Sequence, residues 1–213
     1  MGADTPIVKK KTKEIQSMTT NISNETSRLG RRPVKQGPRP QSRNQGWVEK
    51  STTGMKTEKL KIAKDELTVG TWNVRTLWAA GHLELLKEEM KKYRCDILGL
   101  SEVRWTGAGE VNGCEMIWSG DETEHQRGVG FLLNSRARMA LLGYKLVNAR
   151  IIVARFSGQP FNISVIQVYA PTTDSTEEEI EQFYENLDDC LKQIPKKRVE
   201  SHHGRLECQV WQG

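Results

Sequence analysis

LTVGTWNVRTLWAAGHLELLKEEMKKYRCDILGLSEVR, residues 67–104, carries the strongest structural pattern in this chain. It begins with LTVGTWNV, a short β-rich run that predicts a strand. Residues 82–93 then place Leu83, Leu86 and Met90 at helical spacing between charged residues, which predicts an amphipathic helix. CDILGLSEV is a continuous apolar run that ends in polar residues. A strand, a helix and a buried strand in this order predict a βαβ unit with two parallel strands in one sheet.

The sequence after Trp105 predicts more strands. TGAGEVNG is typical of a Gly-rich turn, and CEMIWSG and GVGFLLN are each typical of a strand. ARMALLGYKLV, ARIIVARFSG and FNISVIQVYAP then predict an antiparallel meander of three β-rich segments.

TTDSTEEEIEQFYENLDDCLKQI predicts the clearest helix of the chain. Ser175 and Thr176 are candidate caps, because a Glu lies three residues after each of them. The expected buried stripe consists of Ile180, Phe183, Leu187, Leu191 and Ile194.

Charge divides the 213-residue chain into two parts. Residues 1–66 hold 15 Lys and Arg against 7 Asp and Glu, whereas residues 67–213 hold 17 against 20. With four of the seven prolines, residues 1–66 are predicted to be a disordered basic tail. Its basic clusters indicate either a nucleic-acid or nuclear-localisation patch or a solvated tail. The clusters include Lys9, Lys10, Lys11, Arg31 and Arg32.

Several protein classes are excluded. No run approaches 18 apolar residues, and the N-terminus has no apolar core of a secretory signal. The four cysteines form no CxxC pair, which argues against a zinc ribbon or a thioredoxin-like site. We therefore expect a reduced intracellular protein, nuclear or cytoplasmic, that is neither secreted nor membrane-spanning.

Polar residues at the ends of the two predicted parallel strands are the first candidate site. Asn73 follows the first strand and Glu102 the second, and functional groups gather where such strands end. Carboxylate and amide oxygens suit Mg²⁺, which needs few protein ligands. The structural alternative is that Asn73 caps a turn while Glu102 pairs with Arg75 or Arg104.

Four motifs in order, TWNVRTL, DILGLSEVRW, RGVGFLLN and VYAPT, resemble the endonuclease/exonuclease/phosphatase superfamily. The sequences WNVRTLW and SEVRWTG are most similar to those in the endonuclease domain of RTE-type (BovB-like) LINE retrotransposons and in the craniofacial development protein 2 group derived from them. The resemblance covers about residues 67–197. It implies an α/β sandwich of two sheets flanked by helices and hydrolysis of phosphodiesters or phosphomonoesters.

The resemblance also implies roles for individual residues. Glu102 would be the ligand of Mg²⁺ or Mn²⁺, and Asn73 would contribute to the phosphate and metal site. Tyr169 matches a tyrosine that contacts the scissile phosphate. Arg127 would lie on a loop near nucleic acid, and Arg150 would contact phosphate. DNA is the implied partner.

The sequence departs from this family at its C-terminal end. The family's GD-x-N and S-D-H motifs, which position and activate the nucleophile, are absent. Residues 199–213 read VESHHGRLECQVWQG. His202 and His203 are weak substitutes there, because the segment has no predicted strand and no nearby acid beyond Glu200 and Glu207. We therefore expect a C-terminally truncated domain over residues 67–198, followed by an unrelated extension over 199–213.

This truncation predicts a partial sandwich, mainly the first sheet with its helices. An uncovered inner sheet face would be apolar and would favour self-association and marginal stability. Three functions compete: an endonuclease that is inactive or impaired, a non-catalytic nucleic-acid- or protein-binding protein, and a small-molecule phosphatase. The similarity of these motifs to RTE-type sequences argues against the phosphatase. The missing GD-x-N and S-D-H motifs favour the non-catalytic binding protein over an active endonuclease.

Overall fold

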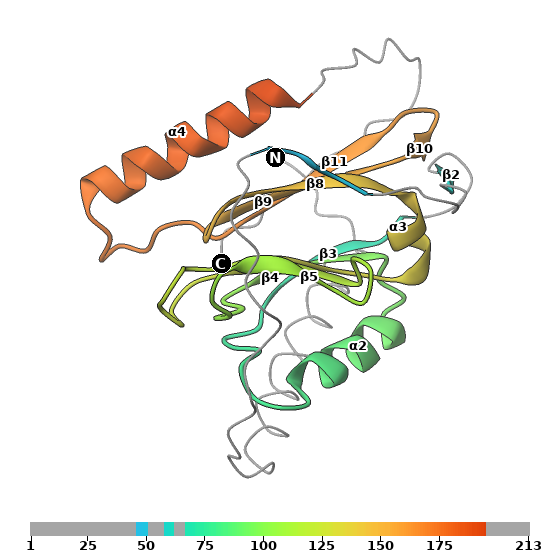
Figure 1. Ribbon diagram of the computed structural model, residues 1–213, viewed down its shortest axis with the longest axis horizontal. Coiled ribbons are helices and arrows are strands. Elements are labelled where there is room, and N and C mark those ends of the chain that lie inside the picture. The colour runs from blue at the N-terminus through green and yellow to red at the C-terminus, as the bar shows by residue number, and fades with distance from the viewer. Residues whose placement is uncertain (1–45, 51–57, 62–66, 195–213) are drawn as a thin grey trace, which may run out of the picture.

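The computed structural model describes residues 46–50, 58–61 and 67–194, which form an α/β sandwich of four layers (Figure 1). One helix lies on the outer face of each of two stacked sheets. The five-stranded sheet has the order β3-β4-β7-β6-β5, and the four-stranded sheet has the order β1-β8-β9-β11. The predicted α/β sandwich is confirmed.

The five-stranded sheet contains the predicted βαβ unit. Its strands are β3 (Val69–Asn73), β4 (Ile97–Ser101), β5 (Ala108–Val111), β6 (Met116–Ser119) and β7 (Val129–Leu133). β3 and β4 are parallel, with Asn73 opposite Ser101, and α2 (His82–Lys92) connects them. The helix forms because Leu86 and Met90 pack against the sheet while its charged residues remain outside.

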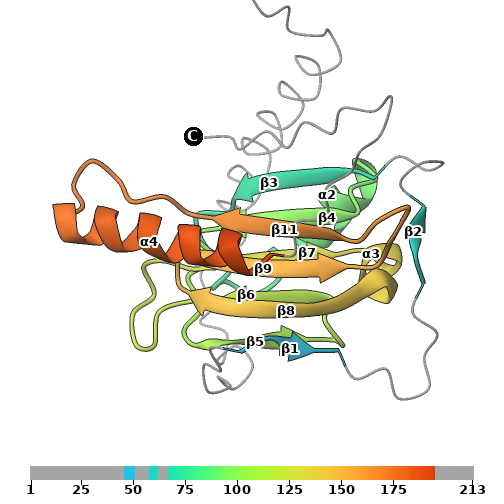
Figure 2. The ribbon, with the colours of Figure 1, turned by 90° about the horizontal axis from the view of Figure 1, so that it is seen from above.

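The second sheet is the predicted meander. It contains β1 (Val48–Glu49), β8 (Leu141–Asn148), β9 (Ile151–Phe156) and β11 (Ile163–Val168), all antiparallel. A separate two-stranded pair joins β2 (Leu60–Lys61) to β10 (Gly158–Gln159). Outside this sheet lies α4 (Glu177–Gln193), as Figure 2 shows. Its Phe183 and Cys190 pack with Ile151 and Val153 of β9.

The main core lies between the two sheets. Phe131 of β7 packs there with Ile152 and Phe156 of β9, and all three are fully buried. The sheets approach closely at Gly99, where a Cβ atom would lie 2.0 Å from Oε1 of Gln167 on β11. The prediction of an uncovered inner face is therefore wrong. Strands β8, β9 and β11 cover the inner face of the five-stranded sheet, so this face offers no basis for self-association.

Residues in the predicted tail take part in this fold. Val48 pairs with Tyr144, and Leu60, which is buried, pairs with Gly158. Two short segments within residues 1–66 are thus ordered, which corrects the prediction of disorder at these positions. The domain limits at residues 66 and 198 remain predictions.

Three local predictions need correction. ARMALLGYKLV is not all strand, because residues up to Ala140 belong to the short helix α3 (Ser135–Ala140), capped by the Asn134 side chain. The predicted Gly-rich turn TGAGEVNG contains β5. In α4, Thr176 is the cap as predicted, but Ile180 and Leu191 are exposed and Cys190 is buried in their stead.

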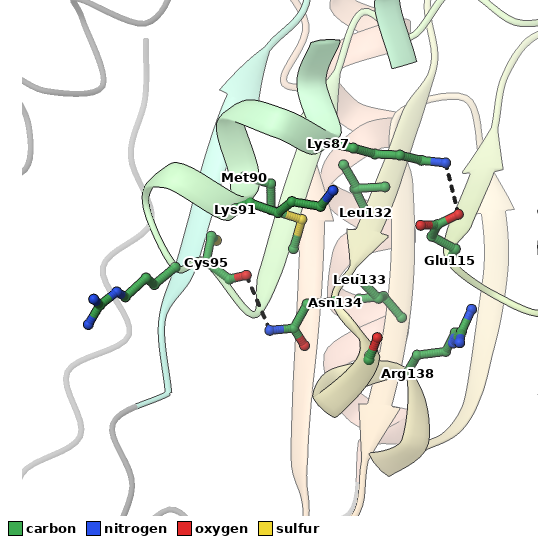
Figure 3. Close-up of a pocket in the computed structure, with 11 residues that line it drawn as sticks. Lys87, Met90, Lys91, Cys95, Glu115, Leu132, Leu133, Asn134 and Arg138 are labelled. Carbon is green, nitrogen blue, oxygen red and sulfur yellow. Dashed lines mark hydrogen bonds and ion pairs between the residues drawn. The ribbon is translucent and has the colours of Figure 1, made fainter. Parts of the chain in front are cut away.

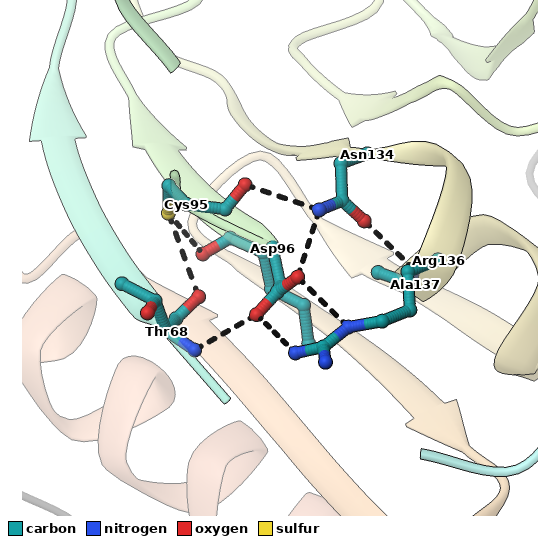
Figure 4. A network of polar contacts seen from close by, with 7 residues as sticks. Thr68, Cys95, Asp96, Asn134, Arg136 and Ala137 are labelled. Carbon is teal, nitrogen blue, oxygen red and sulfur yellow. Dashed lines mark hydrogen bonds and ion pairs between the residues drawn. The ribbon is translucent and has the colours of Figure 1, made fainter. Parts of the chain in front are cut away.

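Asp96 is the centre of a hydrogen-bond network at the end of the five-stranded sheet where β4 begins (Figure 4). It is only 6% exposed. Its carboxylate accepts hydrogen bonds from the Thr68 backbone nitrogen at 2.9 Å, from Asn134 Nδ2 at 2.8 Å, and from Arg136 Nε and Nη2 at 3.1 and 2.7 Å. This network joins the start of β4 to α3.

A pocket of about 310 Å³ lies at this same end, between α2, β7 and α3 (Figure 3). The Lys87 ammonium on its wall is paired with Glu115 at 2.8 Å. The pocket lies at the opposite end of β4 from Glu102, so it is separate from the predicted site. None of the described helices is long and apolar enough to cross a membrane.

Candidate functional site

The ends of β3 and β4 bring Asn73 and Glu102 together. Because the strands are parallel and Asn73 lies opposite Ser101, Glu102 follows one residue beyond the pair. Glu102 has a φ of 55°, and Arg75 and Arg104 on the adjoining loops have φ values of 55° and 57°. Such left-handed backbone is unfavourable for non-glycine residues.

The Glu102 carboxylate is the centre of the site. It accepts hydrogen bonds from Asn73 Nδ2 at 2.6 Å and from Arg104 Nη2 at 2.9 Å, with the Tyr169 hydroxyl at 3.4 Å. Burial opposes its ionisation, but the Asn73 and Arg104 hydrogen bonds and the Arg104 charge outweigh this, so the pKa of Glu102 is lowered. The site therefore holds an ionised carboxylate at neutral pH.

Both structural alternatives for these residues are also observed. Asn73 Oδ1 accepts the Arg75 backbone N–H at 2.9 Å, which closes a turn after β3. Glu102 pairs with Arg104 rather than with Arg75. The two residues thus stabilise the loops, and the same contacts position an anionic oxygen at the end of the sheet.

Tyr169 and Arg150 come from the second sheet. Burial and the negative charge of Glu102 raise the pKa of Tyr169, so its phenol remains a proton donor. The Arg150 guanidinium lies 5.4 Å from the centre of the Tyr169 ring and donates to the backbone oxygens of Tyr169 at 3.3 Å and Ala170 at 3.2 Å. The two sheets therefore contribute to one site.

Arg127 lies on the loop between β6 and β7, as the resemblance implied. Its backbone oxygen accepts from Arg104 N at 3.0 Å, and its guanidinium pairs with Glu179 of α4 at 2.9 Å. Burial and the like charge of Arg127 lower the pKa of Arg150. Arg127 is thus held beside the site, but its charge is already matched by Glu179.

Asp121 and Ser119 were missed by sequence reasoning. Ser119 ends β6, and Asp121 follows two residues later. Among the described residues, the buried side-chain atoms without a hydrogen-bond partner are Ser119 Oγ, Asp121 Oδ2 and Arg104 Nε. All three lie where β4 and β6 end, and buried polar atoms of this kind are normally paired with water, an ion or a ligand. The rule that identified Glu102, a polar residue after a buried strand, also applies to Asp121.

The remaining predicted residues are not placed. Lys9, Lys10, Lys11, Arg31, Arg32, His202 and His203 lie outside the described residues. Within the described ranges, no group of three or more His, Cys, Asp or Glu is arranged to hold a metal ion. A metal ion here would thus depend on very few protein ligands.

Comparison with known proteins gives two relatives with a shared name. No family model matches the chain. Craniofacial development protein 2 of Bos taurus is 42% identical over 156 residues, and that of Tragulus javanicus is 43% identical over 140 residues. The matches cover 71% and 65% of this chain but 26% and 24% of the relatives, so the chain spans about a quarter of their length.

A solved structure also shows partial similarity. The AP endonuclease LMAP from Leishmania major has a TM-score of 0.40 and 15% sequence identity, covering 57% of this chain and 45% of that chain. The similarity to craniofacial development protein 2 that the sequence motifs indicated is confirmed by the curated relatives.

Proposed function

We propose that this chain derives from an RTE-type retroelement endonuclease and retains the metal- and phosphate-binding part of a Mg²⁺-dependent phosphodiester hydrolase. The observation that carries the proposal is the convergence on Glu102 of Asn73 and Tyr169, which lie 29 and 67 residues away in the sequence. DNA is the proposed substrate class. We further propose that cleavage is impaired.

The donor set fits a hard divalent cation. Glu102 is ionised, it lies at the end of a sheet, and its carboxylate oxygens are ligands of the type that Mg²⁺ uses together with several waters. A Mg²⁺ or Mn²⁺ ion held there would neutralise charge on a non-bridging phosphate oxygen. Because Arg104 already pairs with Glu102, we expect the cation to bind weakly without phosphate.

The surrounding donors fit a phosphate. The Tyr169 phenol remains protonated and lies beside Glu102, so it can donate a hydrogen bond to a phosphate oxygen. The Arg104 side chain is 42% exposed, and its buried Nε has no partner. Together these groups supply fixed positive and hydrogen-bonding potential for an anionic ester.

The missing step is activation of water. Hydrolysis needs a base within hydrogen-bond reach of the attacking water. The sequence contains neither GD-x-N nor S-D-H, and the described residues hold no larger acidic or histidine cluster around Glu102. This favours the second candidate function, a nucleic-acid- or protein-binding protein that retains the site without turnover.

Nicking of supercoiled plasmid by the full chain in Mg²⁺ tests the proposal. We expect slow nicking at best, abolished by EDTA and by Glu102→Gln. Glu84→Gln is the matched control, because Glu84 is exposed on α2 and is not among the residues that contact Glu102 in the site described above. Circular dichroism checks that each variant is folded. Nicking that survives Glu102→Gln would contradict the assignment of the site, and absence of nicking with metal-dependent DNA binding would favour the binding function.

A further inference from the structure

Trp78 and His125 form an exposed aromatic pair at the end of the sandwich that carries Glu102. Trp78 lies on the loop after β3, and His125 lies on the loop between β6 and β7. Their ring centres are 4.1 Å apart, with the planes tilted by 58°. Trp78 is nevertheless 42% exposed, although tryptophan is highly buried on average. Its position is therefore not explained by core packing.

Backbone contacts hold His125 and the loop that carries Trp78 against the loop that carries Glu102. His125 Nδ1 lies 2.9 Å from the Arg104 backbone oxygen, and the Arg104 guanidinium holds Glu102. On the other loop, Leu77 N donates to Val103 O at 3.0 Å, and the Leu77 oxygen accepts from the Trp105 indole at 3.0 Å. The aromatic pair is thus attached on both sides to the loop that positions the carboxylate.

The chemistry of this surface suits a nucleobase. An exposed indole beside an imidazole offers a π-face on which any base can stack, and such platforms occur next to backbone-binding cations in single-strand binding sites. Arg75, on the same loop as Trp78, is exposed and supplies a cation to this surface. The His125 loop also carries the exposed Glu122 and Glu124, so charge alone does not recruit nucleic acid there. Stacking has to provide much of the affinity.

We propose that Trp78 and His125 form a stacking platform for an unpaired nucleobase adjacent to the phosphate at Glu102. The inference rests on the proposed function, because it takes a phosphate at Glu102 as its reference point. It assigns to this end of the molecule a preference for single-stranded or locally unstacked nucleic acid. This preference is separate from catalysis and does not require a metal ion.

Fluorescence anisotropy with a labelled single-stranded oligonucleotide in EDTA tests the platform. Trp78→Ala should weaken binding about tenfold, since stacking on one aromatic side chain contributes on the order of 1–3 kcal/mol per base. Trp78→Phe keeps an aromatic ring for stacking, so its affinity for the oligonucleotide should stay within about threefold of that of the unmodified protein. The matched control is Trp47→Ala. Trp47 is similarly exposed at 38%, but it precedes β1, which lies at the opposite edge of the four-stranded sheet from β11.

An abasic oligonucleotide of the same length supplies the second readout. Trp78→Ala should leave its binding unchanged, because no base is present to stack. The platform would be overturned if Trp78→Ala weakened the affinity for both oligonucleotides equally. It would also be overturned if Trp47→Ala weakened the affinity as much as Trp78→Ala does. Unmodified protein that binds both oligonucleotides equally would also overturn it, even where Mg²⁺-dependent nicking is present. Base-dependent binding without nicking would instead support the platform and count against hydrolysis.

Discussion

The left-handed backbone at Glu102 predicts an unusual order of stability among variants at this position. Its φ of 55° crowds a Cβ atom against the backbone, at a cost of about 1–2 kcal/mol for a non-glycine residue. Glu102→Ala keeps that cost, and Glu102→Gly removes it. Both variants lose the same carboxylate contacts, so these losses cancel when the two are compared.

The expected difference follows from two opposing terms. Relief of the backbone stabilises the glycine variant, while the greater freedom of glycine in the unfolded chain costs about 0.4–1 kcal/mol. Glu102→Gly should therefore be more stable than Glu102→Ala by about 0.8 kcal/mol. For a domain of this size, this difference corresponds to about 2–3 °C in Tm.

Urea denaturation of four variants measures this order. At Glu84, inside the first turn of α2, the glycine variant should be less stable than the alanine variant by up to about 1 kcal/mol. The sign of the glycine–alanine difference should thus be opposite at the two positions. If Glu102→Gly is the less stable member of its pair, the left-handed geometry at the site is refuted, and with it the argument that strain is stored there.

Two further outcomes test the charge networks. Arg136→Met should destabilise the fold by about 2–3 kcal/mol, because it leaves the buried Asp96 carboxylate without its guanidinium partner. The control variant Arg138→Met should destabilise it much less. Thermal melts that give the two variants the same Tm would contradict this. Because the pKa of Glu102 is lowered in the folded state, its ionisation contributes stability that is present above the ordinary value of 4.5 and is lost as the pH falls through the folded pKa. Acid titration of the urea midpoint should therefore show a shallower loss of stability for Glu102→Gln than for the unmodified protein, and identical slopes would count against it.

The core of the site was predictable from local sequence because it depends on strand direction. Two parallel strands with polar residues just beyond them must bring Asn73 and Glu102 to the same end of a sheet. Tyr169 comes from the second sheet, and no local pattern relates it to Glu102; only the resemblance of VYAPT to a known motif suggested it. Asp121 was accessible to the same rule as Glu102, but it lies beside Glu122 and Glu124 in a charged loop, so the sequence did not single it out.

Elements set by packing and capping escaped prediction for physical reasons. The apolar run around Ala140 is equally suitable for a helix and a strand, and the Asn134 cap decides in favour of α3. Leu191 has helical spacing but remains exposed, because Cys190 and Phe183 face β9 instead. The Trp78–His125 contact joins two loops that are 47 positions apart, a relation that spacing cannot show.

The assembly of the site from both sheets separates binding from cleavage. Glu102 directly follows β4 of the five-stranded sheet and Tyr169 directly follows β11 of the four-stranded sheet, and the two sheets approach closely at Gly99. A preformed arrangement of carboxylate, phenol and guanidinium can hold a metal-bound phosphate without activating water. Base-dependent binding through Trp78 would then persist even where hydrolysis is impaired. Affinity and activity should therefore respond to different residues: affinity to Trp78, and any residual activity to Glu102.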